Sequence, residues 1–445
     1  MTPALLFRVL RNRARLAEHD AWPRARLLAA RSAALSRLRV FAASRSSYWR
    51  EVLADTEGAP LERLPILTKA ELMARWDDIV TDPDLRLADA QAHVAEMAAG
   101  ALFRGRWYVS ATSGTSGTRG VFAWEPSEWA WILASYARAQ DWAGVGVSLA
   151  KRRRMAVVSS KAPWHQSALV GATVDSPWIP TLRLDAAAPL AETCAALDAF
   201  QPETLVLYAS MARVLAEEQL GGRLRIRPRA VFCASEVLTG ATRARARDAW
   251  GSEPFEVYAA TEPAGIASEC LAHRMHLYED LVIPEFVDEG GRAVPPGTFG
   301  ARTLVTVLFS RTLPLLRYEL DDRVRPSAEP CGCGRPYATI DGIEGRADEV
   351  LELPAAAGGT LAIHPVLFHQ VLEPVSAHGW QVVANGDAIT VLVAHPVAPF
   401  DPRALAAALC RRLREAGVLA PAVRVETVDA IPRGATAKAR QVRRA

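Results

Sequence analysis

The stretch TLVLYASMARVLAEEQLGGRLRIRPRAVFCAS, residues 204–235, decides the fold class. Its β-rich ends, Thr204–Tyr208 and Ala230–Ser235, flank a helical segment. Two more runs of the same kind, Met155–Ser160 and Phe255–Ala260, lie before and after it. Strands that alternate with helices predict a parallel sheet with helices packed on it. Ligands bind beyond the carboxyl ends of such strands, so the residues that follow them are the first candidates for a site.

The bulk composition excludes several classes of function. The chain has 445 residues, half of them hydrophobic, which is enough for a large core. Its 52 lysines and arginines nearly balance 49 acidic residues, so the net charge of +3 does not indicate a nucleic-acid partner. No apolar run reaches the roughly 18 residues that a membrane helix needs. We therefore predict small-molecule substrates, no nucleic-acid or membrane partner, and a homodimer as one candidate assembly.

The first fifty residues are rich in arginine and hold only two acids, Glu18 and Asp20. Leu5, Val9 and Leu16 lie near helical spacing. Such a segment is typical of a transit peptide or of a basic amphipathic helix that folds onto a domain. No small-residue cleavage site follows a hydrophobic core, so we favour the helix and predict a cytoplasmic protein.

Near Gly345 the sequence enters a smaller unit with its own turn signals. Trp380–Ala394 predicts a hairpin with an Asn385-Gly386 turn. A helix is expected to begin at Asp401-Pro402 and to end at Gly417.

These signals together predict an α/β protein in two parts. Residues 1–344 form a large, multi-subdomain N-terminal domain with mostly parallel sheets and helices. Residues 345–445 form a small α+β C-terminal domain.

Two earlier helix starts can be placed from their capping residues. Thr68 is followed three residues on by Glu71, which is the pattern of a capping box. Ser127 is a suitable N-cap for a helix that runs to about Ala139.

A loop of small residues lies within YVSATSGTSGTRGVFAWEPSEW, residues 108–129. From Thr112 to Gly120 it contains mostly glycine, serine and threonine, which allow backbone N–H groups to converge on phosphate oxygens. It is not a Walker P-loop, because it lacks the lysine of GxxxxGK. A flexible surface turn is the alternative interpretation.

Four further motifs follow this loop in a fixed order: YAATE (258–262), LPLLRYELDD (313–322), GRADE (345–349) and IPRGATAKAR (431–440). With these motifs the chain, from about residue 40 to its end, resembles the adenylate-forming ligases. Within that superfamily it is most similar to the phenylacetate–CoA ligase branch, which includes the related deazaflavin-coenzyme adenylyltransferases.

The resemblance implies ATP-dependent activation of a carboxylic acid to an acyl-adenylate, followed by transfer to coenzyme A with release of AMP and pyrophosphate. It implies ATP, Mg²⁺ and coenzyme A as cofactors, and a C-terminal domain that is mobile. Two alternatives stay open. The acceptor could be an amine or another small molecule that receives the acyl or AMP group, or the chain could be a ligase-derived binding protein without turnover.

The resemblance also implies the residues that hold the nucleotide. The loop would cover the phosphates, a slot after one strand would take the purine, and a carboxylate would accept the ribose hydroxyls, with Asp322 preferred to Asp321. The implied ATP-binding residues are Thr112, Ser113, Gly114, Thr115, Ser116, Gly117, Arg119, Ala234, Ser235, Glu236, Tyr258, Asp322 and Arg346. An ordinary helix N-terminus is the alternative for Ser235 and Glu236.

Three residues are implied to act in catalysis, and one in domain rotation. Glu262 would bind Mg²⁺ through hard carboxylate oxygens, and Thr261 beside it would contact the α-phosphate. Lys438 would be the catalytic cation, and Asp348 the hinge. The sequence departs from the family where Ala437 replaces a usual glycine and where Arg119 stands in place of proline or lysine. A capping Thr-Glu pair and a merely basic tail are the alternatives.

The six cysteines are too few for a disulfide framework, but four soft ligands gather in the sequence. Cys270, His276, Cys331 and Cys333 make a Cys₃His set suited to tetrahedral Zn²⁺, which would be structural because no coordination position stays open. His273 is the substitute for His276. Reduced thiols in a turn are the alternative. Some members of the phenylacetate branch bind zinc at a similar arrangement.

The pocket for the acid is implied only in outline. By analogy it lies near Trp164 and His165, and an aromatic lining would fit an aryl or arylacetic acid. A core tryptophan and a hydrogen-bonded histidine explain the same residues equally well.

Overall fold

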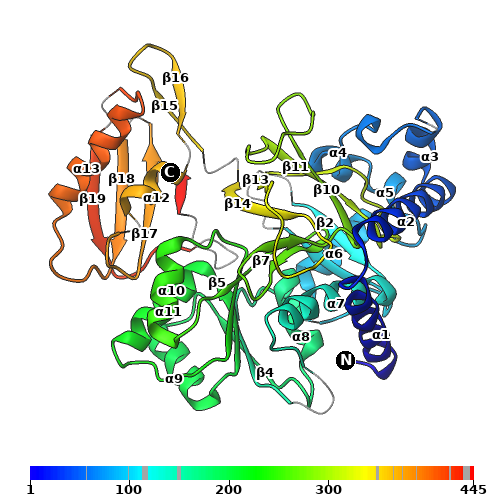
Figure 1. Ribbon diagram of the computed structural model, residues 1–445, viewed down its shortest axis with the longest axis horizontal. Helices are drawn as coiled ribbons and strands as arrows, with labels where there is room; N and C mark the ends of the chain where they lie inside the picture. Colours follow the sequence, from blue (N-terminus) through cyan, green and yellow to red (C-terminus); the bar gives the residue numbers. More distant parts are fainter. Residues whose placement is uncertain are drawn as a thin grey trace.

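The structure is a computed structural model. It describes the chain except for residues 57, 99, 113–118, 148–151, 347–349, 364, 373, 387, 420–421 and 434–440, and it does not describe the side chains of residues 345, 346, 362, 366 and 370. Figure 1 shows a large unit and, beside its helix α10 (Ala209–Leu220), a smaller C-terminal unit.

Over the described residues, the main sheet has nine strands in the order β13-β14-β9-β8-β7-β6-β5-β3-β4. Five of these are parallel: β3 (Met155–Ser159), β4 (Thr181–Asp185), β5 (Thr204–Tyr208), β6 (Ala230–Ala234) and β7 (Phe255–Ala260). The connecting helices are α8 (Gln166–Val174), α9 (Leu190–Phe200), α10 and α11 (Gly240–Trp250). This doubly wound arrangement confirms the predicted α/β class.

The sheet continues in the antiparallel sense beyond β7. The strands concerned are β8 (Ala264–Glu269), β9 (Met275–Leu277), β14 (Thr339–Arg346) and β13 (Asp322–Pro326). Two smaller antiparallel sheets complete the large unit, namely β1 (Tyr108–Ala111) with β2 (Val121–Trp124), and β10 (Val282–Val287) with β11 (Arg302–Val307) and β12 (Tyr318–Leu320).

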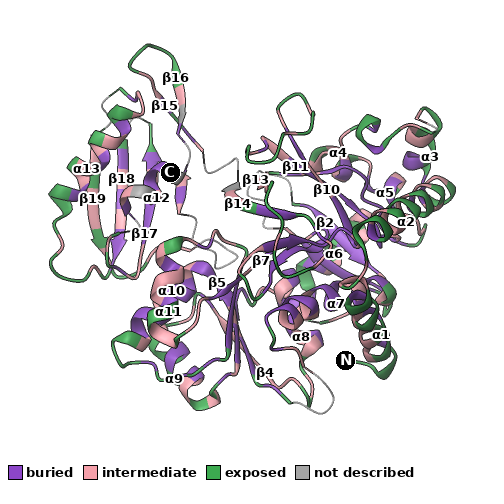
Figure 2. Cartoon of the chain, viewed as in Figure 1, coloured by how far each residue is buried: buried purple, intermediate pink, exposed green. Residues whose placement is uncertain are grey.

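Both faces of the central parallel strands are covered by helices, which explains why β3, β5 and β6 are mostly apolar and buried. Val231 and Cys233 of β6 pack in one core with α9 and α10. Phe232, between them, points to the other face and joins a core with α7 (Pro126–Trp142). Figure 2 shows the buried strands between partly exposed helices.

The N-terminal segment is helical and packs against the large unit. Its helices are α1 (Pro3–His19), α2 (Arg24–Arg45), α3 (Ser47–Ala54), η1 (Leu61–Arg63), α4 (Lys69–Ala74), α5 (Trp76–Ile79) and α6 (Leu87–Glu96). Arg138 of α7 is fully buried and forms an ion pair with Asp280 at 2.6 Å, and His19 of α1 contacts the same carboxylate at 2.7 Å. This network fixes α1 onto α7. No helix in the described ranges has the length and apolar character needed to cross a membrane.

The C-terminal unit, from Leu351 onward, has a hydrophobic core of its own. Its elements are β15 (Leu351–Pro354), β16 (Thr360–Ile363), α12 (Pro365–Leu372), β17 (Gly379–Asn385), β18 (Ala388–Ala394), α13 (Pro402–Glu415), β19 (Ala422–Val428) and β20 (Val442–Arg444). The predicted hairpin is confirmed, with Asn385 paired to Ala388. Asp401 caps α13 by accepting two backbone N–H groups, and Gly417 follows its end at φ +93°.

Two capping predictions need correction. Helix α7 begins one residue before Ser127, with Pro126 in its first turn, and Glu125 rather than Ser127 is the N-cap. Thr68 does accept the N–H of Glu71, but the Glu71 carboxylate accepts a hydrogen bond from Tyr48 at 2.7 Å instead of completing a capping box.

Candidate functional site

A cavity of about 1070 Å³ lies at the carboxyl ends of β4 to β7, where the C-terminal unit meets α10. This central cavity is the place where a doubly wound sheet binds its ligands. The predicted residues Ser235, Glu236, Tyr258 and Asp322 all line it. Its other wall comes from the C-terminal unit and includes His378, His395, Arg433 and Arg443.

Tyr258 and Asp322 meet inside this cavity although they lie 64 positions apart in the chain. The Tyr258 hydroxyl, on buried strand β7, donates to Oδ2 of Asp322 at 3.0 Å. Asp321 is exposed, whereas Asp322 is partly buried and lines the cavity. Of the two aspartates, Asp322 is thus the one that the structure brings into the cavity lining.

Ser235 and Glu236 follow β6 directly. Ser235 adopts φ +70°, which is strained for a residue with a Cβ and turns the chain sharply at the strand end. Oε2 of Glu236 accepts the backbone N–H of Ser210 at 2.8 Å, so this carboxylate caps the first turn of α10. Glu236 thus shapes the cavity wall as well as lining it.

Glu262 lies just beyond β7 and is buried, with 5% of its surface exposed. The Tyr318 hydroxyl donates to Oε1 of Glu262 at 3.2 Å. Burial and the neighbouring Glu262 raise the pKa of Tyr318 well above its usual value, so this phenol stays a donor. Thr261 is held from the other side, because its carbonyl accepts from Nε2 of Gln166 at 2.8 Å.

The predicted phosphate loop joins β1 to β2, and its centre, residues 113–118, falls outside the described residues. At its base, Oγ1 of Thr112 accepts the N–H of Gly120 at 2.9 Å. The Arg119 guanidinium lies 4.0 Å from the ring centre of Trp164, and its Nε donates to the Thr112 carbonyl at 3.2 Å. The base of the loop therefore contacts the segment that we predicted to border the acid.

Three further predicted residues are covered only in part. The backbone of Arg346 pairs with that of Asp322 in the β13–β14 ladder, although its side chain is not described. Asp348 and Lys438 lie in ranges 347–349 and 434–440, outside the described residues. Arg433, within the motif that carries Lys438, lines the central cavity, and sequence reasoning did not single it out.

Near the expected acid pocket, Trp164 and His165 precede α8. The buried His165 places Nδ1 at 2.8 Å from Oγ of Ser167. The Trp164 carbonyl accepts from the N–H of Ala111 at 3.0 Å. Tyr136 donates to Gln166 at 3.0 Å, and that glutamine is the one that holds Thr261. These contacts connect the segment to both the loop and the YAATE motif.

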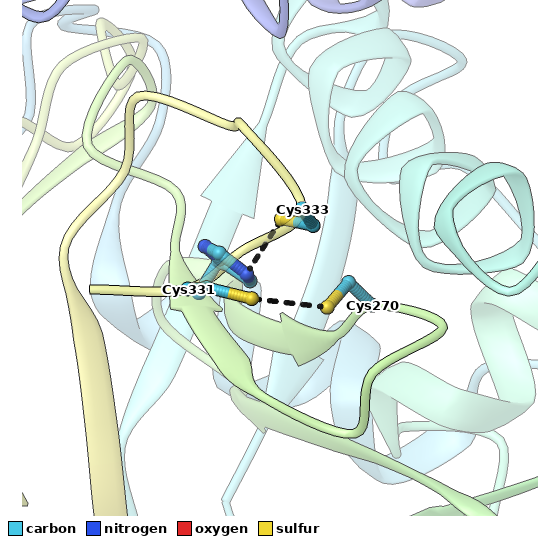
Figure 3. Close-up of side chains that lie close together, drawn as sticks. Cys270, Cys331 and Cys333 are labelled. Atoms are coloured by element: carbon cyan, nitrogen blue, oxygen red, sulfur yellow. Dashed lines mark hydrogen bonds between the residues drawn. The ribbon is translucent and has the colours of Figure 1, made fainter. Parts of the chain in front are cut away.

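The four predicted soft ligands come together between β8, β9 and the Cys331–Cys333 turn (Figure 3). Their ligand atoms all lie within 4.8 Å of one another, with Cys270 Sγ at 3.8 Å from Cys331 Sγ and Cys333 Sγ at 3.3 Å from His276 Nε2. His273 faces elsewhere, since its Nδ1 lies 2.9 Å from Glu269 and its ring stacks on Phe255. Burial lowers the pKa of His276 to about 4, so its ring is neutral at pH 7, as a metal ligand must be.

The chain is similar to known ligases in part of its sequence and in its fold. No protein-family model matches the chain. A phenylacetate–coenzyme A ligase of Thermus thermophilus is 32% identical over 162 residues, which cover 34% of this chain and 36% of that protein, so the match spans about a third of the curated relative.

Among solved structures, a 2-hydroxyisobutyryl-CoA ligase in the postadenylation state, in complex with 2-HIB-AMP, has a TM-score of 0.74 at 19% identity, covering 96% of this chain and 91% of that one. The same ligase in the thioesterification state, with 2-HIB-AMP and CoA, has a TM-score of 0.60 at 18% identity and the same coverage. The chain therefore has the fold of the adenylate-forming ligase superfamily. About a third of its sequence is similar to phenylacetate–coenzyme A ligase.

Proposed function

We propose that the protein is an AMP-forming acid–CoA ligase. It activates a carboxylic acid with ATP to an acyl-adenylate and transfers the acyl group to coenzyme A, releasing AMP and pyrophosphate. The observation that carries this proposal is the convergence of Ser235, Glu236, Tyr258 and Asp322 on one cavity at the carboxyl ends of the parallel strands. The Thermus relative and the 2-hydroxyisobutyryl-CoA ligase are both named as acid–CoA ligases, which supports this proposal.

The ATP-binding roles follow from the chemistry of the lining. Asp322 offers carboxylate oxygens for the two ribose hydroxyls, while Tyr258 orients that carboxylate through its 3.0 Å hydrogen bond. The segment Ala234–Glu236 at the end of β6 would border the purine. The loop from Thr112 to Arg119 would cover the phosphates, with Arg346 contributing from β14.

For catalysis, Glu262 would hold Mg²⁺, which supplies positive charge to the phosphate oxygens when it is bound. The Tyr318 hydroxyl keeps one oxygen of this carboxylate in place. Thr261 would contact the α-phosphate. Lys438 would stabilise the charge that develops as pyrophosphate leaves, and Asp348 would be the hinge between residues 1–344 and 345–445.

The Cys270, His276, Cys331 and Cys333 set fits a structural Zn²⁺. Two thiolate sulfurs bound to one zinc at about 2.3 Å in a tetrahedron lie roughly 3.8 Å apart, and the Cys270–Cys331 distance is 3.8 Å. Four protein ligands leave no position for a substrate, so the metal would fasten the 331–333 turn to β9.

The acid is proposed to be an aryl or arylacetic acid, because the aromatic residues Trp164 and Tyr136 lie close to Gln166, which contacts Thr261. The test is a pyrophosphate-release screen over a panel of carboxylic acids with MgATP, followed by mass spectrometry of the products with and without coenzyme A. An acyl-CoA product supports the proposal. An amide, or a nucleotidylated small molecule, would replace coenzyme A with another acceptor, and absence of ATP binding would favour a protein without turnover.

The Lys438→Ala variant tests the catalytic assignment within the same screen. We expect acid-dependent pyrophosphate release to be abolished while ATP binding, measured by calorimetry, is largely retained. Normal pyrophosphate release by this variant would remove Lys438 from the mechanism.

A further inference from the structure

Helix α10 is the surface on which the C-terminal unit rests, and two arginines cross that contact in opposite directions. Arg213 of α10 is 6% exposed. Its Nε donates to the Ala377 carbonyl at 2.9 Å and its Nη2 to the Val375 carbonyl at 2.6 Å. Both acceptors lie between α12 and β17, so this buried cation uses backbone of the C-terminal unit as its hydrogen-bond partner.

The second arginine, Arg433, belongs to the C-terminal unit and reaches back to α10. Its Nη1 donates to Oγ of Ser210 at 3.3 Å. Burial lowers the pKa of this guanidinium, and the negative charge of Glu236 opposes that effect. Glu236 is also the carboxylate that caps Ser210. Ser210, in the first turn of α10, therefore contacts Glu236 of the large unit and Arg433 of the C-terminal unit. Arg433 lies five positions before Lys438 in the chain.

The arrangement of the two units resembles one stage of a known reaction cycle. The 2-hydroxyisobutyryl-CoA ligase structures compared above share almost the same identity and coverage with this chain. The postadenylation structure nevertheless superposes better than the thioesterification structure. Because the sequences compared are the same, this difference reflects how the parts are placed.

We propose that Arg213 and Arg433 are positioning residues that hold the C-terminal unit in the arrangement used for adenylation. This inference rests on the proposed two-step function. A buried guanidinium satisfied by two carbonyls favours the docked arrangement. On undocking, water replaces those carbonyls, so the contact can open and reform. The two arginines thereby set the balance between the adenylation and thioester-forming arrangements.

The test compares Arg213→Met and Arg433→Met with a matched control, Arg245→Met. Methionine keeps the apolar stem and removes the guanidinium. Arg245 lies on α11 and pairs with Glu217 of α10 at 2.7 Å, so its loss disturbs α10 without removing a contact to the C-terminal unit. We expect acid-dependent ATP–pyrophosphate exchange to fall about tenfold in the first two variants, the effect of a modest population shift. Thioester formation from supplied acyl-adenylate should be unchanged or faster, and the control should behave as wild type.

Parallel loss of both half-reactions, or no change in either, would overturn the inference. Hydrogen exchange provides a readout that does not need activity: backbone amides of residues 375–379 should exchange faster in Arg213→Met than in Arg245→Met. Equal exchange in the two variants would overturn the docking role even in an active enzyme. If the wild type activates no acid, the proposed function fails and the half-reaction claim fails with it, whereas the exchange comparison still decides whether Arg213 docks the unit.

Discussion

The hydroxyl of Tyr258 and the carboxylate of Asp322 are joined by a hydrogen bond of 3.0 Å inside the central cavity. One residue comes from β7 of the parallel sheet and the other from β13 at its antiparallel edge. The bond therefore fixes the Asp322 carboxylate relative to the carboxyl end of β7.

Asp322→Asn should weaken ATP use strongly, because an amide cannot replace a carboxylate that accepts two hydroxyl hydrogens. We expect KM for ATP to rise by about 10- to 100-fold, the value of one or two charged hydrogen bonds. Tyr258→Phe should raise it only a few-fold. Steady-state kinetics at varied ATP measures both, with Asp321→Asn as the neighbouring exposed control. An equal effect of Asp321→Asn would mean that the ribose carboxylate has been misassigned.

Glu262→Gln should lower kcat by at least about 100-fold, since a neutral amide is a poor Mg²⁺ ligand. Tyr318→Phe removes only the hydroxyl that holds Oε1 of Glu262, so its effect should be small. Titration of Mg²⁺ at saturating ATP separates the two, because only Glu262→Gln should demand more metal. An unchanged Mg²⁺ requirement in Glu262→Gln would show that the metal is held elsewhere.

Protein purified without chelator should contain one zinc per chain, measured by elemental analysis. His276→Ala and Cys333→Ser should lose the metal and lower Tm, because the 331–333 turn loses its attachment to β9. His273→Ala and Cys410→Ser are the controls and should keep the metal. A metal-free wild type with the same Tm as His276→Ala and Cys333→Ser would contradict the zinc site and leave the four side chains as a reduced thiol cluster.

The pH dependence of stability should carry a contribution from Glu256, which lines the central cavity. Burial raises the pKa of this carboxyl from 4.5 to about 7, against the attraction of Arg243. The folded state therefore keeps a proton that the unfolded state releases. Its contribution to the free energy of unfolding is complete below about pH 4.5 and is lost as the pH rises through 7.

Glu256→Gln stays neutral, so the stability of this variant relative to wild type should increase between pH 5 and pH 8, by up to about 3 kcal/mol. Urea unfolding at the two pH values measures this difference. Glu253→Gln, three residues away, should show no such trend. Identical slopes for Glu256→Gln and wild type would mean that the carboxyl is ionised across the whole range.

Four of the five parallel strands of the main sheet were predictable because their signal is local: each is a short, mostly apolar run, and residues 204–235 alone specify one complete strand–helix–strand unit. Strand β4 was not predicted, because its sequence TLRLD contains Arg183 and Asp185 and is only partly buried. The antiparallel half was not predictable, since β9 pairs with β14 across about sixty residues. Strand β9 has only three residues, and β14, although it has eight, contains two glycines and no regular apolar pattern. The N-cap of α7 was misplaced because Glu125 is a less common cap than Ser127, although Pro126 marked the first turn.

The candidate site also contains residues that a sequence motif indicates and residues that only a long-range contact reveals. Tyr258, Asp322 and the four soft ligands could be singled out because their spacing belongs to motifs, and the structure brings each set together. Arg213 and Arg433 were missed because an arginine on a helix or in a basic tail usually faces solvent. The hydrogen bonds from Arg213 to Val375 and Ala377, and from Arg433 to Ser210, join the two units, and no local sequence pattern encodes such a contact.

The β13–β14 ladder pairs Asp322 with Arg346, and β14 is the last strand before the chain leaves the large unit. The proposed ribose acceptor, Asp322, thus pairs directly with the strand that leads into the C-terminal unit. A ligand bound in the cavity would therefore stabilise β14 and the connection to the C-terminal unit. Substitutions that destabilise β14 would then weaken ATP binding without removing any contact to the ligand. Nucleotide affinity would in turn report the rigidity of the connection between the two units.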